Sequence, residues 1–359
     1  MKIIYKTSHL KSLYIFFPLL SLFLFFFSTI NASGKAFEIN DIDISSPFEI
    51  NFNKNDVINN GFIKAFDELI LLTVNSSDQK KIGKVQLNEI KGMIETFTIK
   101  EERFIDEIYN VNFGVSFNKK KFFKYLEKMN IFPSIPLKNK FLLIPIIIDE
   151  NSRDLLLFEN NKFFDEWNTK KEKSDLIEYV LPTADLEDLN ILKKNYENIE
   201  NYNFKDITNK YYLKDSIIAL IFKNQKEVRV LSRITIKDNV ILKNQSFEET
   251  NFNNDLNIKK IINSLKIIYE DFWKDMNKIN TSIKLTLSIK IKGSDNDKIS
   301  EFEKILDQTD LVYDYKISKF DNKFMYFKVI FNGTPNEFLN KMKLKNQNFD
   351  TQNKVWLLK

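Results

Sequence analysis

The stretch FLLIPIII, residues Phe141–Ile148, is apolar throughout and eight residues long. A run of this length is typical of a buried β-strand and is too short to cross a membrane, which takes roughly 20 residues. Strand and helix patterns alternate after it. We expect a helix over 162–168, a strand over 175–180 and a helix near 204–213. Strands are expected over 216–222, 227–237 and 239–247, with a turn at Asp238-Asn239 between the last two. A closing helix follows, and its apolar face holds Leu256, Ile261, Leu265, Ile268, Phe272 and Met276. This alternation predicts a central α/β domain with a mixed sheet over residues 138–278.

Residues 37–136 predict a smaller α+β domain before it. Phe37–Ile44 and Tyr109–Phe117 alternate apolar with polar or small residues, which is the period of a half-buried strand. The helices expected here start near Asp56, cover 86–93, and cover 119–129 behind an N-cap at Asn118, whereas 75–84 is expected to be a polar loop. Pro133 and Pro136 then suggest a domain boundary.

Residues 281–359 predict a third domain with the order β-α-β-β-α-β. Alternate residues from Ile283 to Ile291 are apolar, and a helical pattern follows over 299–306. Strands are expected over 311–318 and 324–331, a helix that starts at Pro335, and a final strand over 355–358. That order predicts a ferredoxin-like module, which serves many unrelated functions.

The N-terminal 34 residues have the pattern of an export signal. Lys2, Lys6 and Lys11 precede an apolar run over residues 13–27, and the small residues Ala32-Ser33-Gly34 follow it. Residues 13–30 could instead remain as a single N-terminal membrane anchor. In both cases the rest of the chain is expected on the periplasmic side.

The composition excludes several classes of function. Without the 34-residue leader the chain has 51 basic and 49 acidic residues, too even a balance for a nucleic-acid-binding protein. There is no cysteine, and the only histidine, His9, lies in the leader. A mature protein without these residues has no thiol nucleophile, Ser-His-Asp triad or His-ligated zinc. The seven glycines fit no nucleotide-binding spacing, so no cofactor is predicted.

One acidic segment could carry acid–base chemistry. It is defined by Pro182, Asp185, Leu186, Glu187 and Asp188. Paired carboxylates hydrolyse glycosidic bonds when their environments separate their pKa values. The structural interpretation is that Asp185 caps a helix after Pro182, with Asp188 completing a near capping box, and we favour it. We therefore assign no catalytic, cofactor or metal-binding residue.

Other polar and aromatic groups have simpler interpretations. Glu101, Glu102 and Arg103 are expected in a solvated connection between strands. The lysine runs 119–121 and 170–171 are expected to be solvated. The three tryptophans, expected to pack in hydrophobic cores, are Trp167, Trp273 and Trp356.

The middle of the chain resembles the proteobacterial envelope family of unknown function number 2066. The resemblance rests on the strand that reaches Pro145, on Trp167, on the segment LPTADLEDL at 181–189, and on Tyr211-Tyr212 before an apolar strand. It covers roughly residues 37–250. It departs from the family over Phe62–Phe66, where small residues are expected.

The resemblance implies an exported protein without an assigned activity. In plan, the first two regions are also similar to flagellar assembly protein T, and the middle one to the N-terminal domain of the Tol translocation protein. We therefore expect a non-enzymatic periplasmic protein that supports envelope assembly through unidentified envelope partners. The alternatives are a cell-wall hydrolase that uses Asp185 or Asp188, and a small-molecule binder at the sheet edge of the middle region.

Overall fold

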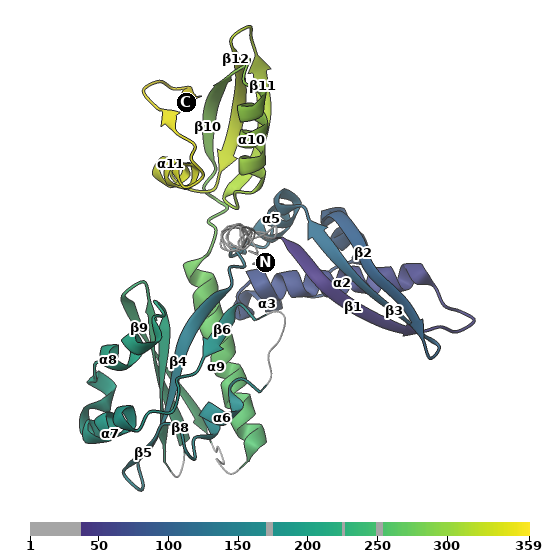
Figure 1. Cartoon of the computed structure of the whole chain (residues 1–359). Helices are drawn as coiled ribbons and strands as arrows, with labels where there is room; N and C mark the ends of the chain where they lie inside the picture. The colour runs from purple at the N-terminus through teal and green to yellow at the C-terminus, as the bar shows by residue number, and fades with distance from the viewer. Residues whose placement is uncertain (1–36, 170–174, 225–226, 249–253) are drawn as a thin grey trace, which may run out of the picture. The chain divides into compact units, whose positions relative to one another are not determined.

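The computed structural model describes residues 37–169, 175–224, 227–248 and 254–359 (Figure 1). Helices and strands are mixed along these residues, and the strands form three separate sheets. This agrees with the predicted α+β and α/β classes. The predicted leader, residues 1–34, lies outside the described residues. Within the described ranges, no helix is both long enough and apolar enough to span a membrane.

The first sheet is antiparallel, in the order β1-β3-β2. Its strands are β1 (Glu38–Pro47), β2 (Ile94–Ile105) and β3 (Ile108–Phe117). Alternate residues of β3 from Tyr109 to Phe117 are buried, as their period predicts. The helices of this region are α2 (Lys54–Thr73), α3 (Ser76–Ile82), α4 (Leu87–Met93) and α5 (Lys119–Glu127). The predicted N-cap of α5 is confirmed, since the Asn118 side chain accepts a hydrogen bond from Lys121 N.

Two predictions in this region are wrong. The expected polar loop at 75–84 contains helix α3, none of whose residues is buried. The sequence of α3 therefore shows no apolar face from which a helix could be predicted. Its first residue is held by Asp271, which accepts hydrogen bonds from Ser76 N and Ser76 Oγ. Glu101–Arg103 lies within strand β2 and not in a connection. Register shifts at Ile94/Thr96 and Ile99/Glu101 interrupt the alternation that would have shown this strand.

The second sheet is mixed, as predicted, and is built around β4 (Asn139–Asp149). On one side, β7 (Ser216–Lys223) is parallel to β4 and is followed by the antiparallel strands β8 (Glu227–Ile236) and β9 (Asn239–Glu248). On the other side, β6 (Ile177–Val180) and β5 (Asp154–Leu156) pair with the two ends of β4. The turn between β8 and β9 is Lys237-Asp238, one residue earlier than predicted, and both residues have positive φ.

Pro145 lies in the middle of β4, where a missing N–H would normally break a central strand. Its carbonyl oxygen faces the gap between β6, which pairs with 139–142, and β5, which pairs with 147–149. The fully buried Asn161 fills this gap. Its Nδ2 donates to the carbonyl oxygens of Pro145, Leu156 and Leu157 at 2.8, 3.2 and 3.0 Å. The proline therefore costs no hydrogen bond.

Helices cover both faces of this sheet (Figure 1). One face packs against α7 (Leu186–Lys194), the 3₁₀ turn η1 (Tyr196–Asn201) and α8 (Lys205–Thr208), which is followed by the 3₁₀ turn η2 (Asn209–Tyr211). The other face packs against α6 (Lys162–Glu166) and α9 (Asp255–Met276). The predicted face of α9 is confirmed in part: Ile261 and Leu265 are buried, whereas Leu256 and Met276 are exposed. The buried face of α9 also includes Tyr269 and Trp273. The apolar pattern omitted these two residues because their side chains carry polar atoms.

The third sheet has the order β11-β12-β10-β14-β13. Its elements are β10 (Leu285–Lys292), α10 (Asn296–Asp307), β11 (Val312–Phe320), β12 (Phe324–Phe331), α11 (Pro335–Lys343), β13 (Phe349–Asp350) and β14 (Trp356–Leu358). Up to α11 this is the predicted split unit. A single strand after α11 would run antiparallel to β10. Instead β13 and β14 form a hairpin, which turns the chain once more and makes β14 parallel to β10.

Candidate functional site

The predicted acidic segment connects β6 to α7 in the middle region. Asp185 is the N-cap of α7, and its Oδ1 accepts a hydrogen bond from Glu187 N at 2.8 Å. This confirms the predicted helix cap. Pro182 is buried, whereas Leu186 and Glu187 are exposed. Only two of the five predicted residues, Asp185 and Asp188, come together around a common partner.

Asp188 does not complete a capping box, so that part of the prediction is wrong. Its side chain is 2% exposed and its Oδ1 accepts a hydrogen bond from Lys210 Nζ at 2.6 Å. Lys210 also donates to Asp185 Oδ2 at 2.9 Å. The aspartate side chain is shorter than the glutamate of a capping box, and here it turns inward to the lysine and away from the N-cap N–H. Asp188 Oδ2 has no hydrogen-bond partner among the described residues.

The shared lysine determines the electrostatics of this carboxylate pair. The hydrogen bond from Lys210, followed by that from Glu187 N, lowers the pKa of Asp185 below its ordinary value. The hydrogen bond to Asp188, followed by that to Asp185, raises the pKa of Lys210 above its ordinary value. A glycosidase acid needs a carboxyl whose pKa is raised, so that it carries a proton near neutral pH. The pKa of Asp185 is lowered instead, so this carboxyl is ionised near neutral pH.

One of the two tyrosines before β7, Tyr211, contacts the start of the acidic segment. Thr183 N donates a hydrogen bond to Tyr211 Oη at 3.1 Å, which ties η2 to the residues before α7. Sequence reasoning noted Tyr211 and Tyr212 but missed Lys210 just before them. No spacing rule links Lys210 to Asp188, because 22 positions separate them in the chain.

Replacing Asp185 with asparagine should give a variant whose stability defect depends on pH. Asparagine keeps an oxygen for the helix cap but loses the charge that faces Lys210. A lowered carboxyl pKa stabilises the fold above the ordinary value of 3.8, and this stabilisation is lost as the pH falls through the folded-state pKa. We therefore expect Asp185→Asn to melt slightly below the wild type at pH 7 and to match it near about pH 2.

Thermal unfolding followed by circular dichroism at both pH values measures this difference. Asp206→Asn, an exposed aspartate without an ion pair among the described residues, is the matched control. A defect of equal size at both pH values would contradict the ion-pair account. Unchanged stability with loss of function in cells would mean that the segment is a binding or catalytic site.

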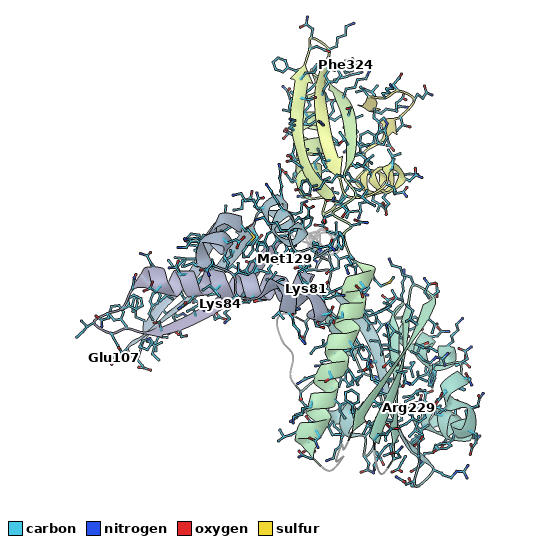
Figure 2. The ribbon with its side chains drawn as sticks, turned by 180° about the vertical axis from the view of Figure 1, so that it is seen from behind. Lys81, Lys84, Glu107, Met129, Arg229 and Phe324 are labelled. Atoms are coloured by element: carbon cyan, nitrogen blue, oxygen red, sulfur yellow. The ribbon has the colours of Figure 1, made fainter. Side chains whose placement is uncertain are left out.

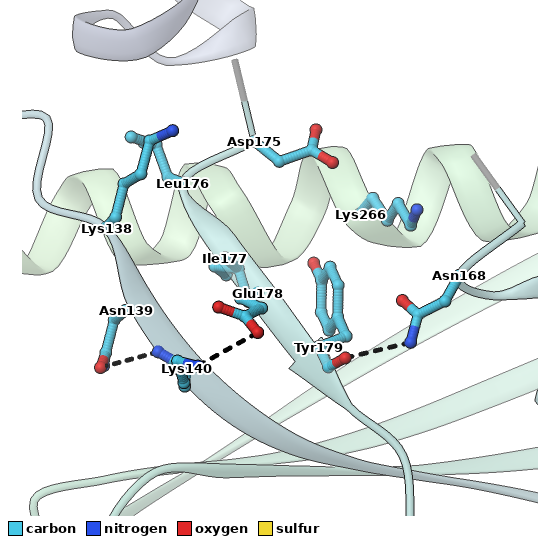
Figure 3. Close-up of a pocket in the computed structure, with 10 residues that line it drawn as sticks. All are labelled: Lys138, Asn139, Lys140, Asn168, Asp175, Leu176, Ile177, Glu178, Tyr179 and Lys266. Carbon is cyan, nitrogen blue, oxygen red and sulfur yellow. Dashed lines mark hydrogen bonds and ion pairs between the residues drawn. The ribbon is translucent and has the colours of Figure 1, made fainter. Parts of the chain in front are cut away.

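A second candidate lies at the sheet edge where β4 meets β6 (Figure 3). A cavity of about 480 Å³ is lined there by Lys138, Lys140 and Lys266 together with Asp175 and Glu178. The three lysines and two carboxylates nearly balance each other in charge, and Lys140 and Glu178 form an ion pair at 3.2 Å. This geometry favours neither anions nor cations.

An aromatic cluster lies beside this cavity. Trp167 is fully buried, and its ring centroid is 5.6 Å from that of Tyr179 and 6.2 Å from that of Tyr269. Trp167 Nε1 and Tyr179 Oη have no hydrogen-bond partner among the described residues. Burial raises the pKa of Tyr179 well above its ordinary value, so this phenol stays protonated. The cluster is hydrophobic core, as predicted for Trp167.

The remaining predictions have mixed outcomes. Trp273 is buried as expected, and Trp356 is half-buried against Phe338 and Phe349. Lys119 is not a solvated lysine: its Nζ donates to Thr309 O at 3.1 Å, and burial lowers its pKa. Lys170 and Lys171 lie outside the described residues.

No metal site emerges from the described part of the chain, in which no three Asp, Glu, His or Cys side chains are grouped suitably. A scan against protein-family models gives no match, and a search of the curated proteins finds no significant relative. The function therefore has to be inferred from the surfaces and charges of the molecule itself.

Proposed function

We propose that this chain is a non-enzymatic exported protein that acts as an adaptor in envelope assembly. The observation that carries the proposal is the open edge of β2. No other described strand pairs with this edge, and every residue of β2 after Ile94 is exposed. Unpaired backbone N–H and C=O groups along a strand edge bind a further strand well. The partner that fits is an extended segment of another envelope protein.

The part of β2 best suited to this contact is Thr96–Ile99. It carries no charge and lies between the two register shifts of the strand. Phe97 and Ile99 are 45% and 36% exposed and would provide apolar contacts for an added strand. In the charged half of β2 beyond Ile99, two side chains already form ion pairs within the chain: Lys100 with Asp41 and Glu102 with Lys54. The hairpin that β2 forms with β3 turns at Glu107 (Figure 2).

The hydrolase alternative finds less support. It needs one protonated and one ionised carboxyl, whereas Lys210 binds both Asp185 and Asp188. A screen of the purified protein against peptidoglycan and generic ester and glycoside substrates separates the two hypotheses. Turnover that Asp185→Asn abolishes in a folded protein would exclude the adaptor role.

Export is the second part of the proposal and rests on the basic, apolar and small-residue order of residues 1–34. N-terminal sequencing of protein from fractionated cells tests it. A mature end near Lys35 or Phe37 in the periplasm is the expected result. An intact leader in the membrane fraction would point to an anchor, and an intact leader in the soluble cytoplasm would contradict export.

Photo-crosslinking in cells tests the edge of β2 directly. A photoreactive residue at Thr96 or Thr98 should form adducts with the same partner, because successive side chains on one face of a strand contact one added strand. Mass spectrometry should map both adducts to one segment of that partner, at positions about two residues apart. The same photoreactive residue at Asn244, exposed on the edge strand β9, is the control and should not label that segment.

The double variant Phe97→Lys/Ile99→Lys completes the test. It adds charge to the proposed contact and should abolish the adducts while the protein still melts cooperatively. Adducts with a second copy of the chain would replace the adaptor role with self-association. Adducts scattered over unrelated proteins, or none at either position, would contradict strand addition.

A further inference from the structure

A second polar cleft lies in the middle region and shares no lining residue with the carboxylate pair or with β2. Its volume is about 700 Å³, and it is lined by α8, the residues after η2, and the ends of β7, β8 and β9 where the Lys237-Asp238 turn lies. Four of its lining residues are cations: Lys205, Lys214, Arg233 and Lys237. The only carboxylate that lines it within the described residues is Asp238, which leaves an excess of three positive charges.

Within the described ranges, three of these cations are not held in an ion pair. Lys205, Lys214 and Lys237 are exposed and form no ion pair with any described residue. Like charges that face one cavity repel each other and concentrate anions there. The nearby carboxylate of Asp215 does not line the cleft; it is buried and accepts hydrogen bonds from Lys237 N and Asn139 Nδ2. Counting its charge as well still leaves an excess of two positive charges here.

The remaining cation is held in a fixed position. Arg233 donates from Nη1 to Tyr202 O at 2.5 Å and to Glu200 O at 3.4 Å. Its guanidinium carbon lies 5.7 Å from the centre of the Phe204 ring. Asp215 likewise fixes the backbone at Lys237, where the two-residue turn begins. Fixed cations lose little conformational freedom when an anion binds, so these contacts pre-organise the cleft.

The rest of the lining suits a phosphorylated organic molecule. Thr208, Ser216 and Thr235 provide hydroxyl groups next to the cations. Tyr212 is 95% exposed at the same cleft, in a left-handed conformation with φ of 53°. An exposed aromatic ring there offers an apolar face to the organic part of a ligand.

We propose that this cleft binds a small phosphorylated ligand. A phosphate group has about −1.5 to −2 charges at neutral pH and three acceptor oxygens, which matches several lysines and an arginine better than one carboxylate does. The proposal is independent of the adaptor function, because none of the residues that line the cleft belongs to β2. The phosphate could belong to a soluble metabolite or to a lipid headgroup.

Calorimetric titration of the full-length mature protein with pyrophosphate tests the cleft. The double variant Lys214→Gln/Lys237→Gln should bind at least about tenfold more weakly than the wild type, because it loses two charge-assisted contacts. The control Lys194→Gln/Lys260→Gln removes the same charge from exposed lysines outside the cleft and should leave the affinity within about twofold. Circular dichroism confirms that both variants are folded.

Vesicles distinguish the two sources of phosphate. A lipid headgroup would be identified if the protein binds phosphatidylglycerol vesicles but not phosphatidylcholine vesicles, and if pyrophosphate displaces it from the former. Pyrophosphate binding without vesicle binding would identify a soluble ligand. Equal affinity for wild type and the cleft variant, or an equal loss in the control, would overturn the proposal, as would failure of the wild type to bind any of these probes.

Discussion

Replacing Asn161 with alanine should lower the free energy of unfolding by about 3 kcal/mol, among the largest effects expected from one polar side chain here. The Asn161 amide group donates to three carbonyl oxygens, and its Oδ1 accepts from Phe163 N and Phe164 N at the start of α6. Each buried polar group left without a partner costs about 1–3 kcal/mol, and loss of the helix cap adds about 1 kcal/mol.

Urea unfolding followed by fluorescence measures this loss. The control is Asn168→Ala, because Asn168 donates a single hydrogen bond, to Tyr179 O at 3.0 Å, and its loss should cost about 1 kcal/mol. Asn161→Asp tests the donor role separately: it keeps an oxygen for the α6 cap but cannot donate to Pro145. If Asn161→Ala were no more harmful than Asn168→Ala, water would have to satisfy these carbonyls and our account of Pro145 would fail.

A second large effect is expected at Gly61, in the middle of α2. Alanine is the better helix former by about 1 kcal/mol, so propensity alone predicts a more stable protein. However, a Cβ at this position would lie 1.5 Å from Cζ of Phe113, whose ring is fully buried. Overpacking of this kind costs about 1–3 kcal/mol. We therefore expect Gly61→Ala to destabilise the fold by about 2 kcal/mol.

Gly92 provides the matched control for this experiment. It also lies in a helix, α4, but a Cβ there would meet no atom within 4 Å. Gly92→Ala should therefore raise the free energy of unfolding by about 0.5–1 kcal/mol. If both variants gained stability, the close approach of α2 to β3 would be wrong.

The sequence predicted elements whose apolar pattern is long and regular. The alternation at Tyr109–Phe117 and the apolar run at Phe141–Ile148 each gave a strand where the structure has one. It did not reveal α3, which has no buried face, or β5, which is three residues long. The closing hairpin of the third sheet was also missed, because β13 contains only two residues.

The candidate site shows the same limit. Asp185 as a helix cap depends on neighbouring residues and could be predicted from them. The partnership of Asp188 with Lys210 depends on how η2 packs beside α7, which no local pattern records. The cations of the phosphate cleft lie on separate elements between Lys205 and Lys237, so only the folded chain brings them together.

The parallel pairing of β4 with β7 has a consequence for how the protein folds. Asp149 and Lys223 face each other in this ladder although 74 residues separate them. Closing so long a loop costs entropy before any contact is gained, so this pairing should form late and slowly. Until β7 arrives, the apolar run Phe141–Ile148 lacks its longest partner strand and presents an aggregation-prone edge. During synthesis, a chaperone that binds extended apolar segments would therefore be needed most at β4.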